Sequence, residues 1–244
     1  MGRMALSVVA CCALLALPVE ADVIFGHYGA TDPETEGWDA DPEVGTSVTP
    51  VGPILDDGGY DAWFINDVVS SSSGSSGGYW GVLDETQSTQ AATDGWKLRT
   101  TVRVANVPDV GYGSVAVYFF DGATQWYLDF ETDATGQQIV TAVTALGFAG
   151  IDYNSGSGGY HSYEIVYDPL AGNADVFVDG VEQISDWEGM STAINENRFK
   201  FGSGCSLDVG QGNYSLVEFE IVPEPATLTL LALGALAALR RRRG

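Results

Sequence analysis

The chain has 244 residues, and its 33 Asp and Glu against 10 Lys and Arg give a formal net charge of −23. Half of the basic residues lie at the two ends, so residues 22–222 carry 31 acidic and 5 basic side chains, a net of −26. Nucleic acids and anionic membranes are excluded as partners, because binding to them relies on Lys and Arg that neutralise phosphates. With 45% hydrophobic and only 18% charged residues, the composition indicates a folded globular protein.

Residues 1–21 have the pattern of a secretory signal peptide. Arg3 supplies a basic start, an apolar core follows over residues 5–17, and small residues occupy the −3 and −1 positions before Asp22. We predict a signal-peptide helix that is cleaved after Ala21. The alternative, a buried N-terminal helix of the domain, is disfavoured by the abrupt change in polarity at Asp22.

Two acidic loops follow, at residues 32–43 and 56–61. Calcium takes carboxylate and carbonyl oxygens from flexible loops, which makes Asp56, Asp57 and Asp61 candidate calcium ligands. Neither loop has the EF-hand spacing. Acidic loops that only keep the protein soluble are the alternative.

Between residues 22 and 222 apolar residues recur with a period of two. Along residues 96–104, for example, Trp96, Leu98 and Val102 alternate with polar side chains, as in a strand with one buried and one solvated face. Gly, Asn, Asp and Pro separate such runs every eight to fourteen residues. We therefore predict an all-β protein, an antiparallel β-sandwich in one domain of residues 22–222. The runs are residues 96–104, 114–121, 125–131, 137–146, 160–168, 174–178, 198–201 and 214–222.

Aromatic residues beside carboxylates within these runs are candidate glycan contacts. Trp80 lies beside Tyr79, and the stripe of Trp126, Leu128 and Phe130 reads as core. That alternation leaves Tyr127, Asp129 and Glu131 facing outward. We predict glycan contacts at Trp80, Tyr127, Asp129 and Glu131.

Residues 160–180 resemble the strand, turn and strand of concanavalin A-like, laminin-G-like jelly rolls. They begin with Tyr160-His161-Ser162-Tyr163 and end in the turn Val178-Asp179-Gly180. Since the shared motifs are structural, the resemblance implies the jelly-roll fold rather than an activity.

Glycoside hydrolases of this superfamily alternate carboxylates along one strand, so that one pair can serve as nucleophile and acid. The nearest strings here are residues 129–133 and 218–220, and neither has the expected residue types. His27 and His161 are the only histidines, and His161 lies in the structural motif, so a Ser or Cys triad has nothing else to use as its base. Catalytic residues are therefore not assigned.

The C-terminus resembles the PEP-CTERM sorting signal of Gram-negative, exopolysaccharide-producing bacteria. Pro223, Glu224 and Pro225 precede an apolar run over residues 226–239, and an arginine tail follows. The run would span about 21 Å as a helix, short of the roughly 30 Å hydrocarbon core, which suits a temporary membrane anchor. The resemblance implies an exosortase-type protease as partner. The sorting segment covers residues 223–244, with its tail at Arg240, Arg241, Arg242 and Arg243.

Together these features predict an exported, non-catalytic protein of the cell surface or extracellular matrix that binds glycan or exopolysaccharide. A glycoside hydrolase or polysaccharide lyase of the same fold is the first alternative, and a purely structural envelope component is the second. No cofactor other than calcium is expected.

Overall fold

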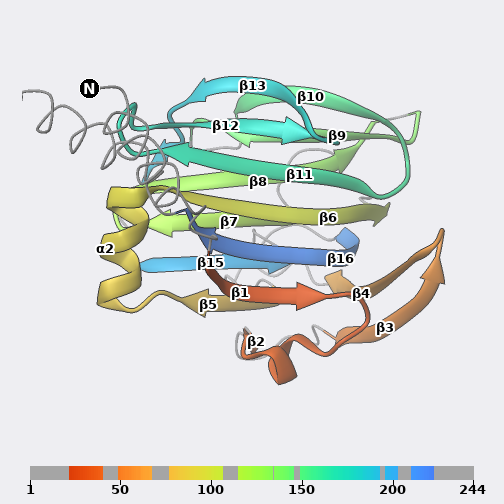
Figure 1. Ribbon diagram of the computed structural model, residues 1–244. Coiled ribbons are helices and arrows are strands. Elements are labelled where there is room, and N and C mark those ends of the chain that lie inside the picture. Colours follow the sequence, from red (N-terminus) through yellow and green to blue (C-terminus); the bar gives the residue numbers. More distant parts are fainter. Residues whose placement is uncertain are drawn as a thin grey trace, which may run out of the picture. The chain divides into compact units, whose positions relative to one another are not determined.

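The protein is described from a computed structural model (Figure 1). The described residues are 22–40, 49–67, 77–106, 115–133, 135–145, 149–192, 196–202 and 210–222. The chain divides into a compact unit of residues 23–221 and a second unit of residues 1–22 and 222–244, of which only Asp22 and Val222 are described. The signal-peptide helix and the C-terminal sorting segment thus lie outside the described residues. Within the described part, no helix combines the length and apolarity needed to cross a membrane.

One sheet of the compact unit is built around the long central strand β6, and its successive neighbours pair antiparallel. Strand β1 (Asp22–Tyr28) is added to it by pairing with β16. The order of this first sheet is β13 (Val181–Trp187), β12 (Asn173–Val178), β11 (His161–Asp168), β6 (Trp96–Asn106), β16 (Gly210–Ile221), β4 (Tyr60–Asp67) and β3 (Thr49–Asp57).

The other sheet is also antiparallel. A two-residue strand, β14 (Met190–Ser191), pairs with β8 outside the main order. The order of this second sheet is β10 (Gly150–Ser157), β9 (Gln137–Val143), β8 (Thr124–Thr132), β7 (Ala116–Asp121), β15 (Asn197–Gly202), β5 (Gly78–Val82) and β2 (Asp39–Ala40).

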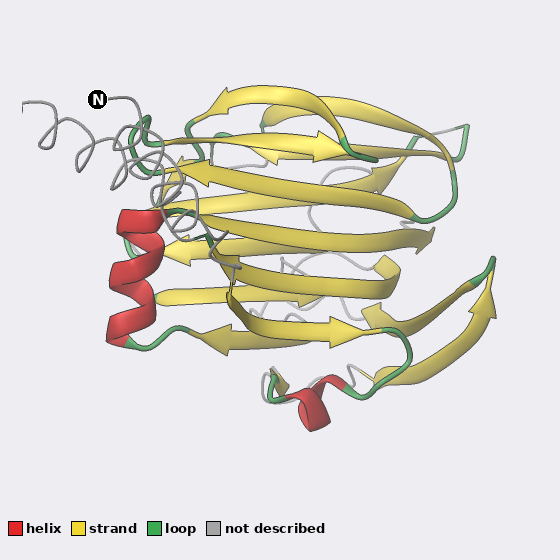
Figure 2. Cartoon of the chain, viewed as in Figure 1, coloured by secondary structure: helices red, strands yellow, loops and turns green. Residues whose placement is uncertain are grey.

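The inner faces of the two sheets share one hydrophobic core, which confirms the predicted antiparallel β-sandwich (Figure 2). Trp96 of β6 lies at the centre of an aromatic group, stacked on Phe219 and edge-on to Phe119 and Trp126. Burial of each such side chain contributes about 1.5–3 kcal/mol. The alternation predicted along β6 is therefore the alternation that builds the core.

The helix α2 (Glu85–Asp94) was not predicted from the sequence. It is polar on nearly all sides and buries only Ala91, so it lacks the apolar period by which helices are recognised. Its start is specified instead by a capping box, in which Asp84 and Gln87 exchange hydrogen bonds between side chain and backbone. A short 3-10 helix, η1 (Pro33–Glu36), occupies part of the predicted acidic loop.

The predicted turn at Asp179 and Gly180 joins β12 to β13, and both residues have positive φ, 50° and 78°. Nδ1 of His161 lies 2.8 Å from Oδ2 of Asp179, and Oδ1 of Asp179 accepts a hydrogen bond from the backbone N–H of Ser162. His161 therefore holds this turn against β11.

Candidate functional site

Outward side chains of the first sheet form a polar surface over its central strands. Alternation along β6 turns Lys97, Arg99 and Thr101 away from the core, and the cross-strand register sets Glu164 of β11 and Glu218 of β16 on either side of Arg99. We call this surface the polar face. It consists of Lys97, Arg99, Thr101, Ser162, Glu164, Phe177, Leu216, Glu218 and Glu220.

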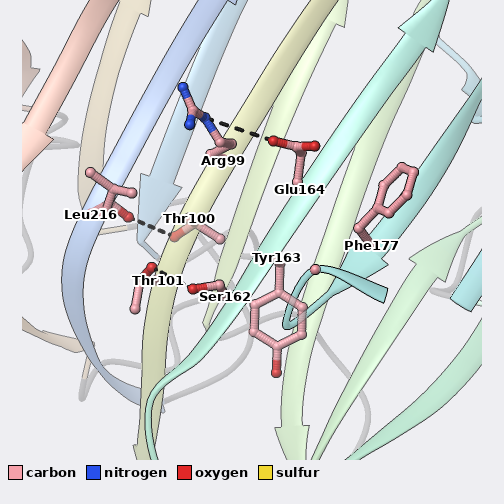
Figure 3. Close-up of a pocket in the computed structure, with 9 residues that line it drawn as sticks. Arg99, Thr100, Thr101, Ser162, Tyr163, Glu164, Phe177 and Leu216 are labelled. Carbon is pink, nitrogen blue, oxygen red and sulfur yellow. Dashed lines mark hydrogen bonds and ion pairs between the residues drawn. The ribbon is translucent and has the colours of Figure 1, made fainter. Parts of the chain in front are cut away.

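A shallow cavity of about 430 Å³ opens on the polar face. Figure 3 shows Arg99 and Glu164 pointing toward each other at one end and the ring of Phe177 standing at the side of the cavity. The hydroxyls of Thr101 and Ser162, 3.0 Å apart, lie between β6 and β11. The cavity thus combines an aromatic wall with hydroxyl, guanidinium and carboxylate groups, the mixture by which small polar ligands are oriented.

Arg99 is the centre of an ion-pair network. Its Nη2 lies 3.2 Å from Oε2 of Glu218 and also contacts Oε1 of Glu220, and its Nε lies 3.8 Å from Oε2 of Glu164. Nζ of Lys97 is 3.8 Å from Oε1 of Glu164. Pairs that are partly exposed contribute at most about 1 kcal/mol each, so the network serves mainly to hold the side chains in position.

Tyr28 of β1 extends this network, because its hydroxyl donates to Oε1 of Glu218 at 2.8 Å. Burial and the neighbouring Glu218 carboxylate raise the pKa of Tyr28 to about 12. The hydroxyl therefore remains a donor to Glu218 at neutral pH.

A second cluster adjoins the polar face at the next outward position of β6. Oδ2 of Asp57 accepts hydrogen bonds from Nη2 of Arg103 at 2.7 Å, Nδ2 of Asn213 at 2.7 Å and the hydroxyl of Tyr160 at 2.8 Å. The Tyr160 ring stacks on Tyr60 with centroids 4.5 Å apart. Burial and the Asp57 carboxylate raise the pKa of Tyr160 well above its usual range. We call these five residues the tyrosine cluster.

The three candidate calcium ligands lie at the tip of the β3–β4 hairpin, but with different partners. Oδ2 of Asp57 is engaged in the tyrosine cluster, while Oδ1 of Asp61 accepts the backbone N–H of Asp56 at 3.0 Å. Among the described residues, no three His, Cys, Asp or Glu side chains are grouped as metal ligands. Calcium at this loop stays a prediction.

The four predicted glycan contacts lie on the second sheet, away from the cavity. Tyr127 and Asp129 are each 1% exposed, so the prediction that they face solvent is wrong. Tyr127 packs with Tyr118, Phe120 and Val143 in a second hydrophobic cluster. The prediction failed because the alternation of apolar and polar residues cannot show that the outward face of a strand is also covered. Glu131 is partly exposed on the same strand.

Trp80 is also partly exposed, whereas the other five tryptophans are buried. It lies on β5, separated from β8 by β15 and β7. At about 4.8 Å between strands, Trp80 is some 14 Å from the β8 residues. The structure therefore does not bring the four residues into one site.

The carboxylate strings found in the sequence have structural roles. Asp133 closes the turn before β9, where its Oδ1 accepts hydrogen bonds from the Thr135 hydroxyl and from backbone N–H groups. These bonds, led by that of Thr135, lower the pKa of Asp133. Glu218 and Glu220 instead belong to the ion-pair network of Arg99.

His27 is fully buried, and sequence reasoning assigned it no role. Its Nδ1 lies 2.7 Å from Oε2 of Glu36, its Nε2 lies 3.3 Å from the carbonyl oxygen of Tyr214, and its ring stacks on Phe201. Burial lowers the pKa of His27, although Glu36 opposes that shift. His27 thus ties β1 to η1 and β16 inside the sandwich.

A second cavity of about 320 Å³ lies beside helix α2, lined in part by Trp96, Phe119 and Tyr167. Its carboxylate, Asp121, already accepts hydrogen bonds from the Trp126 indole and from two backbone N–H groups. The polar groups needed to orient a ligand are better represented on the polar face.

A family model described as the PEP-CTERM protein-sorting motif matches residues 222–243. This match confirms the sorting signal indicated by the Pro-Glu-Pro motif and the arginine tail. The motif marks an exported protein that is sorted to the cell envelope or surface and processed by an exosortase.

No curated protein matches the chain in sequence. Among solved structures, a carbohydrate esterase from the Shiga toxin-encoding bacteriophage phi24B has a TM-score of 0.57 at 11% identity, covering 83% of this chain and 99% of the esterase chain. The binding domain of botulinum neurotoxin DC, solved with rat synaptotagmin II, has a TM-score of 0.49 at 14% identity and covers 88% of this chain and 51% of its own. A Trypanosoma rangeli sialidase has a TM-score of 0.48 at 12% identity, and the match covers 91% of this chain and 37% of the sialidase chain.

At these identities the likeness shows the fold alone. It nevertheless corrects the prediction that the protein is not an enzyme. That prediction rested on the absence of recognisable catalytic residues in the sequence, whereas the same sandwich forms nearly the whole of a carbohydrate esterase chain. The fold gives no ground for excluding catalysis.

Proposed function

We propose that this protein is an exported, exosortase-processed envelope protein of a Gram-negative bacterium whose sandwich binds a glycan on the polar face. The observation that supports the proposal is the cavity in which Phe177 stands beside Arg99, Glu164 and the hydroxyls of Thr101 and Ser162. A sugar presents an apolar C–H face and several hydroxyls, which match an aromatic wall and a set of donors and acceptors.

The binding test is affinity gel electrophoresis of the processed protein in gels that contain dextran, hydroxyethyl cellulose or alginate. We expect at least one polymer to slow the wild type, and Phe177→Ala to weaken that binding about tenfold, equivalent to about 1.4 kcal/mol. Leu170→Ala is the matched control, because Leu170 is highly exposed at a turn and does not line the cavity. Migration that no polymer changes would contradict the proposal and favour a structural envelope component.

The same incubations separate binding from turnover. Reducing ends are measured after incubation of the wild type and of Phe177→Ala with each polymer. Their release by the wild type, together with its loss in Phe177→Ala, would show that the polar face supports hydrolysis of a glycan as well as its binding.

Sorting is tested separately by deletion of Pro223–Gly244. We expect the shortened protein to be exported but no longer processed or retained at the surface, because it lacks the matched motif. Immunoblots of surface and medium fractions provide the measurement. Unchanged processing and localisation would show that the segment is not the sorting signal of this protein.

A further inference from the structure

The tyrosine cluster presents an aromatic surface to solvent. Tyr60 is 43% exposed at the end of the β3–β4 hairpin, while its ring stacks on Tyr160. The guanidinium of Arg103 lies over the Tyr160 ring, 5.7 Å from its centroid. The negative face of an accessible tyrosine ring attracts the weakly positive C–H groups of a sugar ring.

The cluster is held rigid by a single carboxylate oxygen. Oδ2 of Asp57 accepts hydrogen bonds from Arg103 of β6, Asn213 of β16 and Tyr160, which directly precedes β11. The charges of Asp57 and Arg103 offset each other. The cluster therefore offers neither the net positive charge that binds an anion nor the free carboxylates that bind a cation.

Two buried polar atoms of the cluster have no hydrogen-bond partner in the described part of the chain. They are Nε of Arg103, a donor, and Oδ1 of Asn213, an acceptor. Asn213 is only 1% exposed, and its amide orientation follows from Nδ2, which donates to Asp57. A hydroxyl group can accept from an N–H and donate to an amide oxygen, whereas a carboxylate can only accept, and a metal ion can bind the amide oxygen but cannot accept from the N–H.

The cluster and the cavity share one face of one strand. Arg99 borders the cavity and Arg103 belongs to the cluster, four residues farther along β6. At about 3.3 Å per residue, the two positions are about 13 Å apart. Thr101, which also lines the cavity, lies between them. A linear polymer that runs along β6 would meet both.

We propose that the tyrosine cluster is a second sugar subsite, specific for a neutral unit, and that with the cavity it binds an extended neutral polysaccharide. This inference rests on the proposed glycan binding and adds to it the ligand's charge class and length. The net charge of −23 agrees, because it opposes the approach of an acidic polymer.

The test compares Tyr60→Ala with Leu55→Ala, which removes another exposed side chain of the same hairpin. Affinity electrophoresis uses neutral dextran and hydroxyethyl cellulose and acidic alginate. We expect a neutral polymer to slow the wild type most and Tyr60→Ala to weaken that binding about tenfold. Tyr60→Phe should keep wild-type binding, because it retains the ring, and Leu55→Ala should not differ from wild type.

Fragments of two and eight sugar units, prepared from the polymer that binds best, then separate the two subsites. Tyr60→Ala should lose affinity for the longer fragment only, while Phe177→Ala should lose affinity for both. Wild-type binding by Tyr60→Ala to polymer and long fragment would overturn the second subsite and leave the proposed function intact. Strongest retardation by alginate would overturn the neutral class, and migration unchanged in every gel would contradict both proposals.

Discussion

Removal of the Asp57 carboxylate should destabilise the sandwich measurably, because three donors, from β6, β16 and the residue before β11, converge on one of its oxygens. In Asp57→Ala, the amide of Asn213 and the hydroxyl of Tyr160 each lose a bond worth about 1 kcal/mol. Arg103 is 34% exposed, so its lost pairing is discounted to about 0.5–1 kcal/mol. The expected loss in free energy of unfolding is about 3 kcal/mol.

For a domain of this size, about 3 kcal/mol corresponds to a fall in Tm of roughly 6–12 °C. Circular dichroism melts of the wild type and the variant measure the fall. Tyr160→Phe removes one donor and keeps the carboxylate, so it should lower Tm by only about 2–4 °C. Glu182→Ala is the charge control, since Glu182 is an exposed acidic residue of β13.

Two outcomes would refute this reasoning. A fall in Tm below about 2 °C for Asp57→Ala would show that the carboxylate does not hold the three donors together. A Tyr160→Phe variant as unstable as Asp57→Ala would show that the tyrosine hydroxyl, rather than the shared acceptor, stabilises the cluster.

Three further predictions concern other parts of the sandwich. Burial lowers the pKa of His27 below its ordinary 6.5, so the unfolded chain binds more protons than the folded protein, and Tm should fall as the pH drops below about 6.5. The variant His27→Gln should show a weaker fall of Tm with pH. A fall as steep as that of the wild type would contradict this role of His27. Asp84→Ala removes the N-cap of α2 and should lower the free energy of unfolding, measured in urea, by about 1 kcal/mol. An unchanged free energy of unfolding would show that the capping box does not stabilise the protein. Chelation with EDTA should leave Tm unchanged, because Arg103 already pairs with Asp57, and a fall that added calcium reverses would instead support the predicted calcium loop.

Much of the fold could be predicted from local patterns. The alternation along β6 identified which residues are buried, and the resemblance around His161 correctly placed the turn at Asp179. Helix α2 escaped prediction because a polar helix at the end of a sandwich has no apolar period. Tyr127 was misassigned because alternation distinguishes two faces of a strand and cannot show that the outward face is also covered.

The candidate site depended on pairing between distant strands. The sequence identified Lys97, Arg99 and Arg103 only as residues of a solvated face. Two of the partners of Arg99 are Glu164 and Glu218, which lie 65 and 119 residues farther along the chain, and only the strand register brings them to Arg99.

By itself the sequence determined where the protein is sent and which class of fold it adopts. A sorting motif is read as a short linear segment, and an all-β fold is encoded in the period of two. Only the tertiary structure decided which outward face stays open to solvent and which polar groups meet there. These depend on strand order and register, which arise from non-local pairing that no local pattern contains.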